Sequence, residues 1–172
     1  MPTPSFLPLG KSIVWSPDMM AQHQKEDKIL GIVRNWIESG DNRPPWDVVA
    51  PKSTDLKYWW TRYEGLRISK NTNLLEIAWV DSDGANRWRI ITPKSLQTLL
   101  MKEWHDSVSG GHLGCSKTWG RAKISGFFWS NMRLSVRQHV KQCLICSANK
   151  KRHESKNSPL VKITPGHKFR SE

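Results

Sequence analysis

The chain has 172 residues, and its 27 Lys and Arg against 15 Asp and Glu give a formal net charge of +12 at pH 7. It has no apolar run near the roughly 18 residues of a membrane-spanning helix, and its N-terminus lacks the continuous apolar core of a secretory signal. Of its three cysteines, Cys143 and Cys146 form a C-x2-C pair and Cys115 is left over, which suits a reducing compartment rather than a disulfide-stapled secreted domain. These features predict a soluble protein of a reducing compartment, without a membrane partner.

The first part of the chain divides into a tail and a small mixed module. Residues 1–23 hold three prolines before Lys11 and no amphipathic period, so we expect a disordered tail. From Glu26 the apolar residues follow a helical period until Gly40: Ile29, Ile32, Val33, Trp36 and Ile37. A second helix is predicted to begin at Ser53, with Leu56, Trp59, Trp60 and Tyr63 on one face.

Alternating residues then predict a β-hairpin around Asp83 and Gly84, with apolar positions at Leu75, Ile77, Trp79, Trp88 and Ile90. Residues 24–91 are therefore predicted to form an α+β extension. The chain is rich in tryptophan, and aromatic rings can stack on the bases of single strands. Helical and strand spacing favours a core role for them instead.

Residues 92–150 predict a small all-α module of three helices. Thr92 can cap a first helix with Pro93 in its first turn, and the helix ends at His105 with Leu96, Leu99, Leu100 and Trp104 as its buried stripe. Glycines on both sides of His112 allow a tight turn, and a second helix is expected over residues 116–124. A core this small is marginal without a staple.

The third helix, over residues 131–142, is predicted to be apolar on one stripe and basic beside it. Met132, Val136 and Val140 recur every four residues, and Arg133, Arg137 and Lys141 follow one position later. Asn131 is a plausible N-cap. Two further basic groups are Lys117, Arg121 and Lys123, and Lys150, Lys151 and Arg152.

The positive charge is concentrated in the second half of the chain. Residues 1–92 hold twelve Lys and Arg against eleven Asp and Glu, whereas residues 93–172 hold fifteen against four. Such asymmetry is typical of a protein that binds a polyanion, so the nine basic residues above are candidate nucleic-acid contacts. A solubilising surface is the alternative. For residues 150–152, a soluble linker or a nuclear-localisation signal are alternatives too.

Four residues have the types and spacing of a zinc site: His105, His112, Cys143 and Cys146, in the order H-x6-H-x30-C-x2-C. The C-x2-C pair alone also fits a redox dithiol or a fortuitous pair. Two imidazoles and two thiolates together match a closed tetrahedral site, so we expect one structural zinc ion and no catalytic metal. Cys115 lies three residues after His112 and can compete for metal, but an inert or mildly reactive thiol is preferred.

The residues around these ligands carry a family resemblance. In order they are His105-Asp106-Ser107, Gly111-His112-Leu113-Gly114, Lys117-Thr118, Phe127-Phe128-Trp129, Met132, and Cys143-Leu144-Ile145-Cys146 with Lys150. Together they resemble the zinc-binding N-terminal (HHCC) domain of integrases from gypsy-type LTR retrotransposons and retroviruses. The resemblance implies that residues 24–91 are the extension preceding that domain and that residues 151–172 are a basic linker toward a catalytic core. Ser130 departs from the family, which often has a proline there.

The integrase reaction needs three carboxylates on two divalent metals, and after Cys146 this chain offers only Glu154 and Glu172. We therefore expect no catalytic residues, no small-molecule substrate and no strand transfer by this chain alone. The resemblance implies binding to DNA, either retroelement ends or non-specific sequence, and support of integrase multimerisation through contacts with itself or the catalytic core. It also implies a location in the nucleus, or in the cytoplasm before nuclear entry, and no secretion. The alternative is a host-retained protein-interaction or adaptor module without a DNA role.

Overall fold

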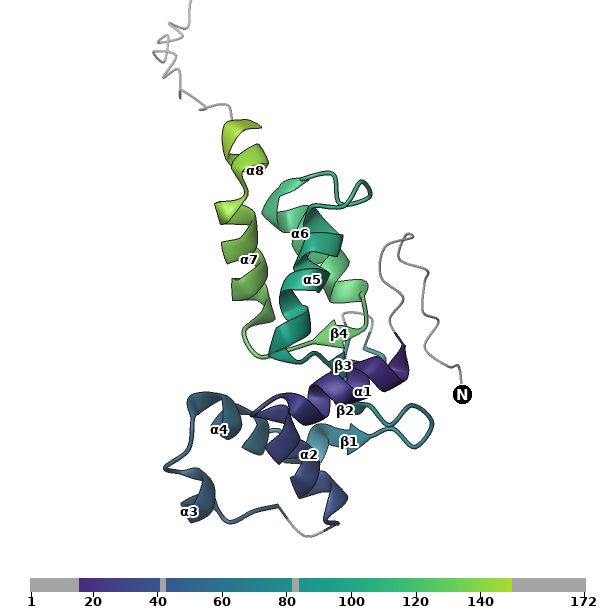
Figure 1. Ribbon diagram of the computed structural model, residues 1–172, viewed down its shortest axis with the longest axis vertical. Helices are drawn as coiled ribbons and strands as arrows, with labels where there is room; N and C mark the ends of the chain where they lie inside the picture. The colour runs from purple at the N-terminus through teal and green to yellow at the C-terminus, as the bar shows by residue number, and fades with distance from the viewer. Residues whose placement is uncertain (1–15, 41–42, 82–83, 150–172) are drawn as a thin grey trace, which may run out of the picture.

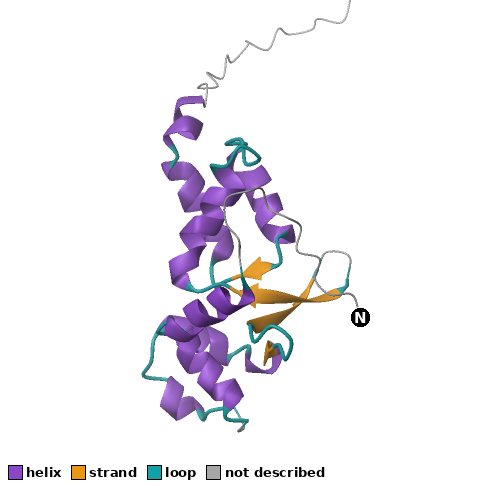
Figure 2. Cartoon of the chain, turned by 45° about the vertical axis from the view of Figure 1, so that its right-hand side comes forward, coloured by secondary structure: helices purple, strands orange, loops and turns teal. Residues whose placement is uncertain are grey.

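The computed structural model describes residues 16–40, 43–81 and 84–149. In this part of the chain, two mostly helical halves lie on either side of a small β-sheet (Figures 1 and 2). Helices α1–α4 belong to the N-terminal half, and helices α5–α8 belong to the C-terminal half. The fold is therefore mixed helix and sheet, in agreement with the α+β extension predicted for residues 24–91.

The N-terminal half contains α1 (Pro17–Glu26), α2 (Leu30–Glu38), α3 (Trp46–Val49), α4 (Thr54–Trp60) and the short 3-10 helix η1 (Tyr63–Gly65). Helix α4 begins one residue after the predicted start at Ser53, because Ser53 is its N-cap and its hydroxyl accepts a hydrogen bond from the Leu56 amide at 3.3 Å. The prediction of a disordered tail up to residue 23 is wrong for residues 17–23, which lie in α1. Residues 1–15 lie outside the described residues.

The sheet has four strands in the order β1-β2-β3-β4. β1 (Leu66–Ile68), β2 (Leu75–Val80) and β3 (Asn86–Ile91) are antiparallel neighbours, which confirms the predicted hairpin. β4 (Phe127–Phe128) comes from the C-terminal half and lies parallel to β3, with Ile90 opposite Phe127. The Gly126 carbonyl accepts a hydrogen bond from the Ile90 amide at 2.8 Å. One sheet therefore joins the two halves.

The C-terminal half contains α5 (Lys94–His105), α6 (Gly114–Ile124), α7 (Met132–Gln142) and α8 (Leu144–Asn149). The expectation of an all-α module with three helices needs correction, because the described residues there include four helices and strand β4. Leu99, predicted to be buried, is 39% exposed. Helix α5 begins at Lys94 after an N-cap at Pro93, one residue later than the predicted cap at Thr92.

Two apolar cores hold this arrangement together. The N-terminal core is Leu30, Val33, Val49, Leu56, Trp59, Leu66, Leu75, Ile77, Ile91 and Phe128. The C-terminal core is Met20, Ala21, Leu74, Ile90, Leu96, Leu100, Trp104, Ala122, Phe127, Trp129, Met132, Val136 and Val140. Because each core draws residues from both halves, the packing crosses the predicted boundary at residue 92.

A buried polar contact strengthens this junction. The Gln24 side chain of α1 is fully buried and donates hydrogen bonds to the carbonyls of Leu75 and Ile91 at 3.1 and 2.6 Å. Its oxygen accepts from the Leu75 amide at 2.8 Å and from Arg34 at 3.2 Å. All of its hydrogen-bonding groups thus have partners, as burial of an amide requires. Helix α1 is thereby fixed against strands β2 and β3.

Candidate metal centre

His105 is the last residue of α5 and is fully buried. The helix is anchored by Leu100 and Trp104 in the C-terminal core, and the Trp104 ring stacks on Trp129 with centroids 5.8 Å apart and planes 5° apart. Arg121 of α6 donates a hydrogen bond to the Trp104 carbonyl at 3.2 Å, satisfying a group at the end of the helix. The first ligand is therefore held by a rigid helix end.

The loop after α5 brings His112 back to His105. The His112 amide donates to the His105 carbonyl at 3.1 Å, and His112 adopts a left-handed backbone with φ of 49°. Gly110 permits the close return, because a Cβ there would lie 2.6 Å from the His105 carbonyl carbon and oxygen. Glycine is thus required at position 110, because the backbone of the loop passes close to His105 there.

The two cysteines come from the junction of α7 and α8. Met132, Val136 and Val140 of α7 are buried in the C-terminal core, which fixes the direction of this helix as its apolar stripe predicted. Cys143 follows α7, and the amide of Cys146 lies 3.5 Å from the Cys143 sulfur. This turn presents both sulfurs to one point.

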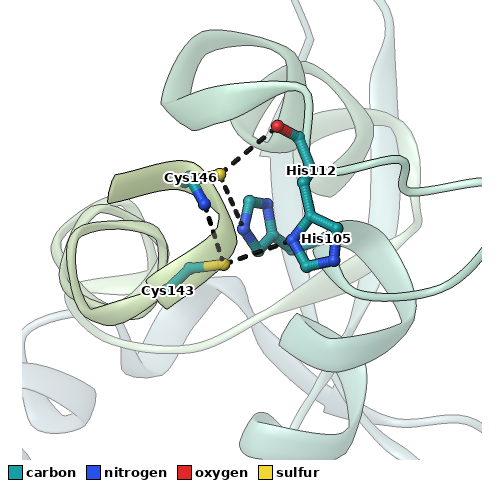
Figure 3. A group of neighbouring side chains, drawn as sticks. All are labelled: His105, His112, Cys143 and Cys146. Atoms are coloured by element: carbon teal, nitrogen blue, oxygen red, sulfur yellow. Dashed lines mark hydrogen bonds between the residues drawn. The ribbon is translucent and has the colours of Figure 1, made fainter. Parts of the chain in front are cut away.

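The four side chains converge from three segments of the chain (Figure 3). His112 Nδ1 lies 3.2 Å from Cys143 Sγ, and His105 Nε2 lies 3.4 Å from Cys146 Sγ. All four ligand atoms lie within 4.8 Å of one another. A tetrahedral zinc ion with ordinary bond lengths separates such nitrogen and sulfur ligands by about 3.3–3.8 Å. The geometry therefore fits one zinc ion in a closed site.

The electrostatics of His105 favour metal binding. Burial lowers the pKa of the His105 imidazole, and the neighbouring Asp106 carboxylate opposes this shift only in part. A neutral ring is the form that binds zinc. Asp106 in turn lies 3.2 Å from His139 Nε2, a histidine outside the ligand group. Cys115, the thiol considered as a competing ligand, lies outside the ligand group and packs against the C-terminal core.

Sequence reasoning missed one residue of this site. Thr118 of α6 is 2% exposed, and its hydroxyl oxygen lies 3.0 Å from Nδ1 of His105. Its place in the Lys117-Thr118 motif marked it as part of the resemblance, but the pattern gave no partner for the hydroxyl. Only the packing of α6 against α5 reveals that contact.

The predicted nucleic-acid residues lie on α6 and α7. Arg133, Arg137 and Lys141 are exposed on α7, and Lys117 and Lys123 are exposed on α6. Arg121 is half-buried and holds the Trp104 carbonyl, so it has a structural contact as well. The predicted contacts at residues 150–152 lie outside the described residues. Among the described helices, none is long and apolar enough to cross a membrane.

Comparison with known proteins agrees with this geometry. Residues 92–152 match the family model of the integrase zinc binding domain. The chain is also 26% identical over 139 residues to the uncharacterized protein K02A2.6 of Caenorhabditis elegans. That match covers 80% of this chain but 9% of the relative, so the chain spans a small part of the relative's length. No solved structure matches the chain significantly. Residues 92–152 are thus similar to the integrase zinc-binding domain, and His105, His112, Cys143 and Cys146 form a cluster within them that can hold one zinc ion.

Proposed function

We propose that this chain is the zinc-binding part of a gypsy-like retroelement integrase, or of a remnant retained by a host, and that it binds DNA through phosphates. The family match supports the integrase origin. The zinc ion is structural in this proposal, since all four ligand positions belong to the protein and leave no open position for substrate.

The observation that carries the DNA proposal is the two-sided character of α7. Its apolar stripe is buried in the C-terminal core, whereas Arg133, Arg137 and Lys141 all lie on the exposed side. Because these cations repeat every four residues, they lie along one line of the helix surface. A row of cations of this kind fits the repeated phosphates of a duplex better than it fits a single small ligand.

Helix α6 extends this basic surface. The Arg133 guanidinium lies 6.0 Å from the centre of the Trp119 ring, so the exposed sides of α6 and α7 meet there. Lys123, one helical turn after Trp119, is exposed on α6 and adds to the positive charge. Few acidic residues interrupt the C-terminal half of the sequence, which supports attraction of phosphates over general solubility.

The test is the salt dependence of DNA affinity. An Arg133→Ala, Arg137→Ala, Lys141→Ala variant that loses three phosphate contacts should flatten the slope of log affinity against log salt by about 2.7. Affinity should fall similarly for unrelated duplexes, because phosphate contacts carry little sequence information.

A matched control removes three exposed lysines of the N-terminal half, Lys28, Lys52 and Lys70. This variant loses the same net charge and should keep the wild-type slope. Equal slopes for all three zinc-loaded proteins would refute phosphate binding by α7.

That refuting outcome would favour the second candidate, a protein-interaction module. Exposed apolar side chains near the ligands support it: Leu113 is 57% exposed, Leu144 84% and Ile145 51%. Such residues suit contacts with another copy of the chain, with an integrase catalytic core or with a host protein. Concentration-dependent mass in sedimentation experiments, abolished by polar substitutions at Leu144 and Ile145, would identify self-association.

The matched family is the non-catalytic zinc domain of integrases. We therefore propose further that this chain by itself neither processes nor joins DNA ends, and that it acts in the nucleus, where integrase meets its target DNA.

A further inference from the structure

We propose that Thr118 is a positioning residue for the metal, because its hydroxyl fixes the tautomer of His105 and so directs Nε2 toward zinc. The two side chains meet inside the protein, with Thr118 2% exposed and His105 fully buried. Water is therefore excluded from their contact, and the hydrogen bond between them is the one that Nδ1 makes.

The direction of this hydrogen bond follows from the other partner of Thr118. A threonine hydroxyl has one proton to donate and two lone pairs. Its proton is directed to the Gly114 carbonyl, 2.9 Å away and one turn earlier in α6. The oxygen can then act only as an acceptor toward His105, so Nδ1 must carry a proton.

The consequence for the metal is direct. A neutral imidazole with its proton on Nδ1 has its lone pair on Nε2. Nε2 is the atom of His105 that faces the ligand cluster, 3.4 Å from Cys146 Sγ. Thr118 therefore holds the ring in the tautomer and the orientation that zinc binding requires.

The same hydroxyl also connects the two histidine ligands. Gly114, whose carbonyl it holds, lies two residues after His112 and adopts a left-handed backbone with φ of 79°. One side chain thus contacts the ring of the first ligand and the backbone that follows the second. Removing the hydroxyl should loosen both, whereas removing only the methyl group should leave both in place.

The experiment compares Thr118→Val, which keeps the shape and loses the hydroxyl, with Thr118→Ser, which keeps the hydroxyl. Zinc affinity of the full chain is measured by competition with a chelator at neutral pH, without DNA. Loss of such a supporting hydrogen bond typically weakens metal binding about 10–100-fold, which is the expectation for the valine variant. The serine variant should bind within about threefold of wild type, far less than that typical loss.

Thr92→Val is the matched control. Thr92 is 1% exposed, and within the described part of the chain its hydroxyl oxygen has no hydrogen-bond partner. Its replacement makes the same chemical change in a buried position and should leave zinc affinity unaltered. Valine at residue 118 binding as tightly as wild type, or serine binding as weakly as valine, would overturn the proposal.

Nitrogen-15 NMR of the histidine rings in zinc-loaded wild-type protein tests the tautomer without any substitution. His105 should show a protonated Nδ1 and a metal-bound Nε2, and His112 should show metal bound to Nδ1, the atom that faces Cys143. This measurement decides the matter even if the valine variant does not fold. A His105 ring bound through Nδ1, with its proton on Nε2, would refute the assignment.

Discussion

Removing zinc should unfold the region around the four ligands while leaving the N-terminal core folded. The ion crosslinks residues 105 and 146, which are 41 positions apart. By the chain-entropy estimate for a crosslink of that length, this constraint alone is worth about 4 kcal/mol at 25 °C. The full apparent binding energy of structural zinc in small domains is larger, about 10–16 kcal/mol near neutral pH.

These magnitudes decide the outcome. Domains of this size are stable by only about 5–15 kcal/mol, so loss of zinc removes an amount comparable to the whole stability. Without the ion, only hydrogen bonds involving sulfur, such as those of His112 with Cys143 and of His105 with Cys146, link the side chains of this partly buried cluster. The N-terminal core contains one residue of the C-terminal half, Phe128, and none of the ligands, so it should survive.

Hydrogen exchange measured by mass spectrometry, with and without a strong chelator, tests this division. Protection should be lost in peptides covering residues 100–118 and 132–149 and retained in α2 and β2. A Cys143→Ser, Cys146→Ser variant should show the same pattern without chelator. Unchanged protection in protein shown by metal analysis to be zinc-free would refute the reasoning, and so would uniform loss over the whole chain.

Two further predictions concern the backbone and the charges. Gly110→Ala should weaken zinc binding and destabilise the protein by more than about 1 kcal/mol, because the new Cβ would overlap the His105 carbonyl. A urea unfolding midpoint close to that of the wild type would contradict this prediction. For Asp81, burial raises the carboxyl pKa, but hydrogen bonds from Arg87 and Arg89 outweigh it and leave the pKa below its usual value. Its stabilisation is therefore complete above the unfolded pKa of about 3.9 and is lost as the pH falls through the lower folded value. The difference in urea midpoint between wild type and Asp81→Asn should shrink below about pH 4, and a constant difference down to pH 2 would count against the ion pairs.

The zinc ligands and the hairpin were predictable because both leave a local signature. Spacing between His105, His112 and the cysteine pair defines a ligand set without knowledge of the fold. Apolar residues at alternate positions on both sides of Gly84, at Leu75, Ile77 and Trp79 and at Trp88 and Ile90, predict the two long strands of the sheet in the same way. The structure brings the four ligands together as that spacing required.

The features that were missed depend on contacts distant in sequence. Helix α1 is mostly polar and buries only Met20, Ala21 and Gln24, so its sequence gives little amphipathic signal. Gln24 is buried because two strands provide its hydrogen-bond partners. Strand β4 has two residues, too short for any period, and it is a strand because β3 lies beside it. The role proposed for Thr118 likewise depends on a distant contact, because its partner His105 in α5 is thirteen residues away in the chain.

Strand β4 determines how the two halves of the molecule move relative to each other. It is bonded edge to edge with β3, and Gln24 clamps the same sheet from the opposite helical half. The two halves therefore move together as one rigid unit, joined by the sheet. If α7 binds a duplex as proposed, the exposed Trp46 and Trp88 of the N-terminal half take a fixed orientation relative to that duplex. The pairing of β4 with β3 therefore fixes the orientation of these two rings relative to α7.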